Sequence, residues 1–166
     1  MNLYLMRHSE AEDEVESGGD ESRHLTVRGR QRTRDAAGGL RALGLQFDAI
    51  LTSPLLRAVE TAELVADVYA RNPLPQVLPA LSPSVAASEA LAALTPFAHQ
   101  EEVLIVGHEP QLSQLVAVFL TPDGSVSIRL KKGACIALDL PKSCEPGCAE
   151  LRWMLTQRHL RMLRKS

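Results

Sequence analysis

Short apolar runs alternate along the chain with segments of helical periodicity. The runs at 2–6, 47–53 and 101–108 are the clearest strand candidates, and "EEVLIVGH" at 101–108 is the strongest of them. A run without polar alternation is typical of a strand that is covered on both faces. Because helical segments separate these strands, the pattern predicts an α/β layered fold with a mainly parallel sheet.

Start signals and periodicity predict helices over four segments: 27–43, from Pro54 to about 69, about 88–98, and from Pro110 to about 120. Thr26 is a suitable N-cap for the first helix, although Gly38 and Gly39 weaken its pattern. Ser53 followed by Pro54 indicates the start of the second, because proline suits the first helical position.

The remaining segments are rich in turn signals. Residues 72–84 contain four prolines and are predicted to form a connection with one short strand. After the "PDG" turn, the segments 125–130 and 134–140 are predicted to pair as strands, and 150–156 is the last predicted strand. The basic tail is interpreted either as a final helix or as a segment that binds an acidic partner. Its cations are Arg158, Arg161, Arg164 and Lys165.

Size and composition are those of one globular domain, which we take to span residues 1–166. A net charge of −2 gives no argument for nucleic-acid binding. No stretch approaches the ~20 apolar residues of a membrane span, and the N-terminus lacks the pattern of a signal peptide. We therefore expect a cytoplasmic protein with no nucleic-acid or membrane partner, and a monomer as the simplest state.

Three cysteines fit a reducing compartment. Cys135 lies in an apolar run and is expected to be a small buried hydrophobe. Cys144 and Cys148 flank "EPG" in a turn. A single pair of cysteines at this spacing is weak support for zinc or for a disulfide, so their state is left open.

Polar side chains follow three of the predicted strands. Arg7 and His8 come after the first strand, Arg57 comes shortly after the second, and His108 ends the strongest strand. Ligands of such sheets bind beyond the carboxyl ends of the strands, so these side chains are expected to meet in one crevice. Guanidinium groups bind phosphate oxygens, and a neutral imidazole is a competent nucleophile toward phosphorus. Arginines beside the histidines would repel a divalent cation, so we expect no metal.

The chain resembles the histidine phosphatase superfamily in four segments, which occur in the family's order. They are "LMRHSEAE", "DESRHLTVRG", "LTSPLLRAVETAEL" and "VLIVGHEPQLSQL". The resemblance spans residues 2 to about 120 and is closest to the phosphohistidine phosphatase, or SixA-type, branch. It implies a phosphoglycerate mutase-like fold, a three-layer α/β/α sandwich with a mainly parallel, mixed central sheet.

The resemblance also implies roles for individual residues. His8 would be the nucleophile that becomes phosphorylated, Arg7 and Arg57 would clamp the phosphoryl oxygens, and His108 would complete the pocket and stabilise the transferring group. Supporting roles are implied for a small substrate-contacting residue, two loop-shaping residues and a residue that orients Arg57: Ser9, Thr52, Ser53 and Glu60. Phosphoryl transfer depends on positioning and charge stabilisation, so no cofactor is expected.

The segment "LPALSPSVAASEAL" departs from the family. Many members carry a carboxylic acid here that protonates the leaving group, whereas this chain has only Ser, Val and Ala at 84–87. The nearest acid is Glu89, on a predicted helix. Esters of alcohols need a proton donor, but an imidazole, with a pKa near ~6.5, can leave neutral after protonation from solvent or from His108. This favours a phosphohistidine-bearing protein, such as a phosphorelay transfer domain, as the substrate.

Two other functions remain open at this point. A small-molecule or broad-specificity phosphomonoesterase could use the same pocket with Glu89 or Glu10 as the acid. A phosphate-binding interaction module with little turnover is the second alternative. The presence of both arginines and both histidines argues against that module.

Overall fold

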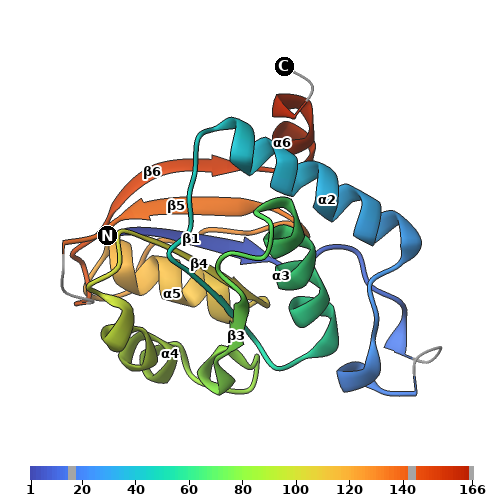
Figure 1. Ribbon diagram of the computed structural model, residues 1–166. Helices are drawn as coiled ribbons and strands as arrows, with labels where there is room; N and C mark the ends of the chain where they lie inside the picture. Colours follow the sequence, from blue (N-terminus) through green and yellow to red (C-terminus); the bar gives the residue numbers. More distant parts are fainter. Residues whose placement is uncertain (15–17, 142–144, 165–166) are drawn as a thin grey trace.

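A central sheet organises the computed structural model, which describes residues 1–14, 18–141 and 145–164 (Figure 1). Within these residues the sheet has six strands in the order β3-β2-β4-β1-β5-β6. The strands are β1 (Asn2–Arg7), β2 (Ala49–Thr52), β3 (Pro75–Val77), β4 (Glu102–Gly107), β5 (Cys135–Asp139) and β6 (Glu150–Leu155). Strands β1 to β4 pair in parallel, while β5 is antiparallel to both β1 and β6. The prediction of a mainly parallel, mixed sheet is confirmed.

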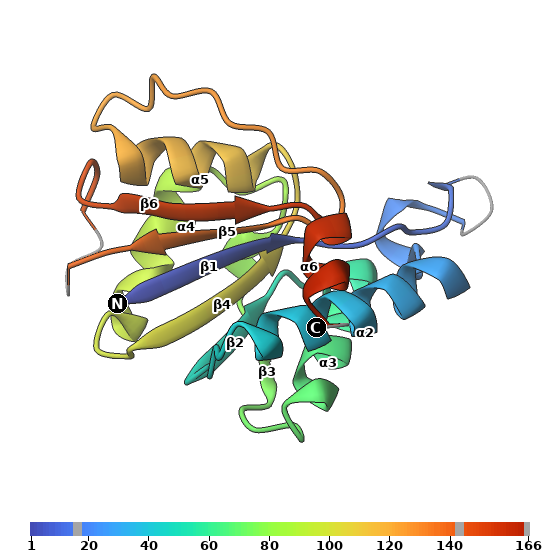
Figure 2. The same ribbon diagram turned by 90° about the horizontal axis from the view of Figure 1, so that it is seen from above.

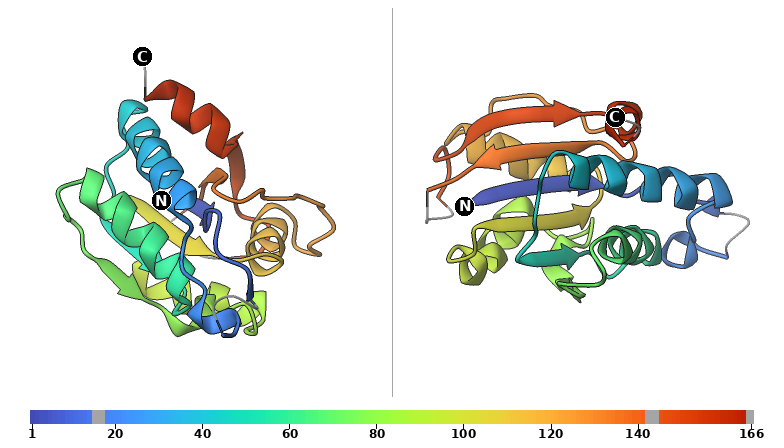
Figure 3. Two further views of the ribbon diagram at one scale, coloured as in Figure 1. Left: turned by 90° about the vertical axis from the view of Figure 1, so that its right-hand side faces the viewer. Right: turned by 45° about the horizontal axis from the view of Figure 1, so that its top comes forward.

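Helices cover both faces of this sheet (Figures 2 and 3). They are α2 (Val27–Ala42), α3 (Leu56–Val68), α4 (Ala87–Leu94), α5 (Gln111–Leu120) and α6 (Gln157–Leu163), with short 3₁₀ turns η1 (Asp20–Ser22), η2 (Pro79–Leu81) and η3 (Thr95–Phe97). The layer of α2, α3 and α6 packs on one face, and α4 and α5 pack on the other. This is the predicted three-layer α/β/α sandwich. Of the described helices, none has the length and apolar character needed to cross a bilayer.

The first strand is buried on both sides. Leu3 and Leu5 belong to the core under α4 and α5, whereas Tyr4 and Met6 belong to the core under α2, α3 and α6. Fully burying a side chain of this size contributes about 1.5–3 kcal/mol. Both faces therefore hold the strand firmly, which explains its continuous apolar run and fixes the position of the residues that follow it.

Helix α2 begins and ends close to its predicted bounds. The side chain of Thr26 accepts a hydrogen bond from the Gly29 amide at 2.9 Å, which confirms the predicted cap. Gly39 is explained by the packing of α6, because a Cβ at this position would overlap the backbone oxygen of Leu160. The tail is thus a final helix over residues 157–163, one of its two interpretations, and its Lys165 lies outside the described residues.

Two predicted elements differ in the structure. Residues 125–130 join no strand; Ile128 and Leu130 instead pack into the core beside α5, so their alternation serves burial rather than pairing. Helix α3 begins at Leu56, two residues after Pro54, because the Ser53 amide still donates to the Val106 oxygen in continuation of the sheet. Cys135 is fully buried as predicted, while Cys144, and with it the question of a pair with its neighbour, lies outside the described residues.

Candidate active site

The register of β1 and β4 places two histidines side by side. Arg7 pairs with Gly107 across the two strands, and the His8 amide donates to the Gly107 oxygen at 3.1 Å. His8 and His108 therefore follow at the same edge of the sheet, with ring centroids 5.0 Å apart. This is the carboxyl end of the parallel strands, which faces the viewer in the left panel of Figure 3.

His8 is held as a neutral base with one defined tautomer. Its Nδ1 lies 2.7 Å from the backbone oxygen of Ser9. A carbonyl oxygen only accepts, so Nδ1 carries the proton and Nε2 keeps its lone pair. Burial lowers the pKa of His8 to about 3, helped by His108 and by the charges of Arg57 and Arg7. The imidazole is therefore unprotonated at neutral pH.

His108 is neutral for similar reasons. Burial, followed by the charge of Arg57, lowers its pKa to about 3, although Asp20 acts in the opposite direction. Its Nε2 lies 2.8 Å from the Ser53 hydroxyl, and the Leu55 amide donates to that same oxygen at 3.3 Å. The hydroxyl can then direct its proton to Nε2, which leaves the ring proton on Nδ1.

Both predicted arginines reach the site, and each uses part of its guanidinium group to donate hydrogen bonds to other residues of the protein. Arg57 donates to the Asp20 backbone oxygen at 2.6 Å and to its carboxylate at 2.9 Å. Arg7 donates to the Leu130 oxygen at 3.0 Å. Their Nε groups and the Nδ1 of His108 are buried, and none of these three atoms is hydrogen-bonded to another described residue. Unpaired buried donors are costly, and an oxyanion bound beside them is a group that can accept from such donors.

These side chains open onto one cavity of about 430 Å³. It is lined by Arg7, His8, Asp20, Arg23, Arg57, Pro83, His108, Glu109 and Lys132. The structure thus brings together the four residues expected to be central. A larger cavity of about 610 Å³ lies between α2 and α6 and is lined by no histidine. In the described part of the chain, no three His, Cys, Asp or Glu side chains cluster as a metal site would require.

Ser9 is placed behind the pocket rather than in it. Its buried hydroxyl accepts a hydrogen bond from Gln157 at 2.7 Å, and it is not among the residues that line the cavity. Gly133 supports the same turn, since its amide donates to the Arg7 and His8 oxygens at 3.1 Å. Its φ of 70° and the closeness of Gln157 leave no room for a side chain. Ser9 therefore connects the turn that carries His8 to α6.

Glu60 does not orient Arg57, in contrast to the expectation. Its carboxylate accepts hydrogen bonds from His24 and from the Leu25 amide, both at 2.7 Å, and from Arg30 at 2.5 Å. These bonds tie α3 to the segment that leads into α2. Asp20 orients Arg57 instead, from a turn 37 residues away in sequence, which local spacing does not reveal.

Neither acid considered from the sequence lines the cavity. Glu89 is exposed in the first turn of α4, and the Glu10 carboxylate accepts from Arg32 at 3.2 Å. The cavity adds four residues that sequence reasoning did not assign: Asp20, Arg23, Glu109 and Lys132. The first two lie within "DESRHLTVRG" and Glu109 directly follows His108, so the matched segments were the available signal for these three. Lys132 lies outside those segments.

Comparisons with known proteins agree with this geometry. The sequence profile of the histidine phosphatase superfamily (branch 1) matches residues 3–81. An uncharacterized protein of Picosynechococcus sp. is 38% identical over 140 residues, which cover 83% of this chain and 84% of that protein. Phosphohistidine phosphatase SixA of Escherichia coli is 27% identical over 164 residues, 98% of each chain.

A solved structure extends the likeness to three dimensions. The protein histidine phosphatase SixA complexed with tungstate superposes with a TM-score of 0.85 at 28% identity, covering 96% of this chain and 99% of that one. The profile covers the segments that carry Arg7, His8 and Arg57. The likeness to SixA, over 98% of the chain, also covers the segment that carries His108. The chain belongs to the histidine phosphatase superfamily and is a phosphatase.

Proposed function

We propose that the protein is a phosphohistidine phosphatase, which removes phosphate from a protein phosphohistidine through a phospho-His8 intermediate. One observation carries the proposal: a neutral His8 with its Nε2 lone pair available faces a cavity where three buried donors have no partner among the described residues. Similarity to SixA over 98% of the chain supports the substrate class. The SixA complex with tungstate, a tetrahedral oxyanion, supports the use of the cavity for a phosphoryl group.

The first half of the reaction follows from these atoms. Phosphoryl oxygens accept from Arg7 Nε, Arg57 Nε and His108 Nδ1, which neutralise charge on the transferring group. His8 Nε2 attacks phosphorus, and the bond from phosphorus to the leaving nitrogen breaks. The electron pair of that bond stays on the leaving nitrogen, which takes up a proton and departs as a neutral imidazole. The Ser9 carbonyl keeps its hydrogen bond to Nδ1 and stabilises the positive charge that develops on the His8 ring.

A water molecule completes the reaction. It attacks the phosphorus of phospho-His8 from the side that the leaving group has vacated, and the phosphorus–Nε2 bond breaks. The electron pair of that bond returns to Nε2, so His8 is again neutral, which is the form that burial favours. Two displacements, each with an activated partner, replace one difficult hydrolysis.

The surroundings of the cavity support a protein substrate. The 82–85 segment brings Pro83 into the lining of the cavity. The connection from β3 to β4 is short and contains only η2, α4 and η3, which leaves little chain to close over a small metabolite. We include in the proposal a cytoplasmic, single-domain monomer that acts on phosphohistidine exposed on a partner's surface.

The substrate class is tested by competition between two kinds of phosphate. A phosphorylated histidine transfer domain and a panel of sugar phosphates are each incubated with the enzyme, and phosphate release is measured. We expect a higher kcat/KM for the transfer domain. Faster turnover of the sugar phosphates would replace this proposal with the phosphomonoesterase, which the presence of Glu109 in the cavity favours.

The covalent intermediate has its own test. Brief exposure to a radiolabelled phosphodonor should place an acid-labile label on the protein, and His8→Ala should remove it. If no donor labels the wild-type protein, a phosphate-binding module with little turnover becomes the better description.

A further inference from the structure

We propose that the carboxyl group of Glu109 carries the proton that the leaving group takes, an inference that rests on the proposed phosphoryl transfer at His8. It fills the role for which the sequence offered no donor at 84–87. Glu109 lines the same cavity as the nucleophile and directly follows His108 in the chain.

Among the described residues, only two carboxylates line this cavity, Asp20 and Glu109. The first of them is already bound to two arginines. Asp20 accepts from Arg23 and from Arg57, each at 2.9 Å. Burial would raise the pKa of Asp20, but the bonds from these two guanidinium groups lower it overall. Asp20 therefore stays ionised and orients Arg57, so it cannot supply a proton.

The two histidines cannot supply the proton either. With pKa values lowered to about 3, His8 and His108 hold no second ring proton at neutral pH. The single ring proton of His8 is bonded to the Ser9 carbonyl, and that of His108 faces the phosphoryl oxygens. Elimination leaves Glu109 as the acid–base group of the cavity.

The contacts of Glu109 fit this role. Its Oε2 accepts from the Ser113 hydroxyl at 2.5 Å, which fixes the carboxyl group. Its Oε1 is buried and accepts no hydrogen bond from any described residue. Neither oxygen forms an ion pair within the described chain, although Glu109 is near enough to oppose the lowering of the Arg7 pKa that burial causes.

A carboxylate in an anion site is otherwise unfavourable. Its charge would repel the incoming phosphoryl group, whereas a carboxyl that has taken up a proton would not. A Glu109 that carries its proton is therefore compatible with a phosphoryl group in the same cavity.

His8 Nε2 forms a bond to phosphorus, and the electron pair of the breaking bond goes to the leaving nitrogen or oxygen. The Glu109 proton moves to that atom, so a neutral leaving group departs and a carboxylate remains. In the second displacement the attacking water gives a proton to the Glu109 carboxylate, which restores the carboxyl group.

The test compares two leaving groups in Glu109→Gln. Phenol, with an acidity like that of a tyrosine side chain, leaves poorly without a proton, whereas p-nitrophenol leaves well as an anion. We expect kcat/KM to fall about 100-fold for phenyl phosphate and by less than about 5-fold for p-nitrophenyl phosphate. Glutamine keeps the shape and can accept from Ser113, but it cannot transfer the proton.

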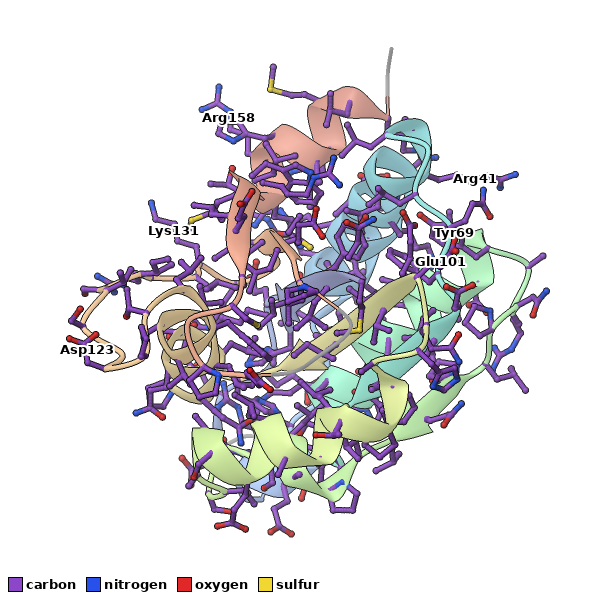
Figure 4. The ribbon with its side chains drawn as sticks, turned by 90° about the vertical axis from the view of Figure 1, so that its left-hand side faces the viewer. Arg41, Tyr69, Glu101, Asp123, Lys131 and Arg158 are labelled. Carbon is purple, nitrogen blue, oxygen red and sulfur yellow. The ribbon has the colours of Figure 1, made fainter. Side chains whose placement is uncertain are left out.

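Controls separate proton transfer from positioning. Glu101→Gln, at the opposite end of the molecule (Figure 4), should leave both rates unchanged. Vanadate should bind Glu109→Gln as tightly as the wild type or more tightly, because a negative charge is removed. Equal losses for both phosphates, weaker vanadate binding, wild-type kinetics, or a selective loss in Glu89→Gln in place of Glu109→Gln would each overturn the inference.

This test does not depend on the natural substrate. If the transfer domain proves inert while aryl phosphates are hydrolysed, the proposed substrate class fails and the comparison of leaving groups still decides the role of Glu109. If the transfer domain is the substrate, Glu109→Gln should slow its dephosphorylation less than that of phenyl phosphate, since an imidazole ring can also be protonated from solvent.

Discussion

At the scale of single residues, the site is prepared before any substrate arrives. One hydrogen bond from His8 to a carbonyl selects the tautomer, and burial beside two guanidinium groups keeps the ring neutral. Asp20 holds Arg57 with two hydrogen bonds, so the charge of that arginine is already oriented. Little reorganisation is then required during transfer, which is the main source of electrostatic catalysis.

The protonation state of the histidines is directly observable. Because their pKa values are lowered to about 3, His8 and His108 should both remain neutral at pH 5, where an ordinary histidine is mostly charged. Nitrogen-detected NMR of the imidazole rings measures this, and His8 should show the Nδ1–H tautomer. Imidazolium signals from either residue at pH 5 would contradict the description of the site.

Replacing Arg57 with lysine tests whether activity depends on the paired N–H groups of the guanidinium rather than on its charge alone. Arg57→Lys keeps the charge but loses the paired geometry toward Asp20 and the oxyanion, so kcat/KM for p-nitrophenyl phosphate should fall about 100-fold. The matched control is Arg41→Lys at the exposed end of α2, where Figure 4 shows the side chain reaching outward. Comparable losses in the two variants would mean that the measured effect is not specific to the site.

At the scale of elements, α6 supports the turn that carries His8. Gln157, its first residue, donates to the Ser9 hydroxyl, and the helix packs directly on α2 through Leu160. Arg161 and Arg164 pair with Asp35 of α2. The basic tail thus has a structural role that links the end of the chain to the turn after β1.

Alanine substitutions at two neighbouring glycines of α2, Gly38 and Gly39, distinguish the effect of packing on stability from the effect of helix propensity. Gly39→Ala places a methyl group against the Leu160 backbone and should destabilise the protein by about 1–3 kcal/mol. Gly38→Ala meets only the flexible Arg164 side chain, so the better helix propensity of alanine, about 1 kcal/mol, should offset the contact. Urea unfolding gives both values, and equal stabilities would argue against the close α2–α6 contact.

At the scale of the whole molecule, burying two neutral histidines links stability to pH. Their folded-state pKa values of about 3 lie below the ordinary 6.5, so the unfolded chain binds more protons between these limits. The contribution of these two histidines to the free energy of unfolding is therefore complete above pH 6.5, and it is lost as the pH falls toward 3. The pKa values of Asp20 and Glu60 are also lowered, from ordinary values of 3.8 and 4.5. Their contribution to stability is therefore lost only as the pH falls below about these values.

The expected size of this effect can be measured. From pH 7.5 to pH 5, each histidine should reduce the free energy of unfolding by about 2 kcal/mol. Denaturant unfolding at the two pH values gives the loss, and His8→Gln, which removes one titrating group, should show about half of it. An unchanged pH dependence in this variant would assign the loss to other groups.

Several parts of the protein depend on local order and can be predicted from the sequence alone. Apolar runs identified β1, β2 and β4, and the residues at their ends were placed correctly, because parallel strands covered by helices must present their carboxyl ends at one edge. The sequence therefore predicts that four residues meet, and all four line the cavity: Arg7, His8, Arg57 and His108. The cap at Thr26 is equally local.

Tertiary structure decided the partners of those residues. Asp20 rather than Glu60 orients Arg57, and Ser9 turns toward Gln157, because each contact joins segments that are distant in the chain. Residues 125–130 have the alternating pattern of a strand but do not pair with one. Their apolar side chains are buried by packing beside α5 instead of by joining the sheet. Glu109 lines the cavity, and the sequence did not predict this. The direction in which a side chain faces depends on the segments that pack around it, and local sequence pattern does not contain that information.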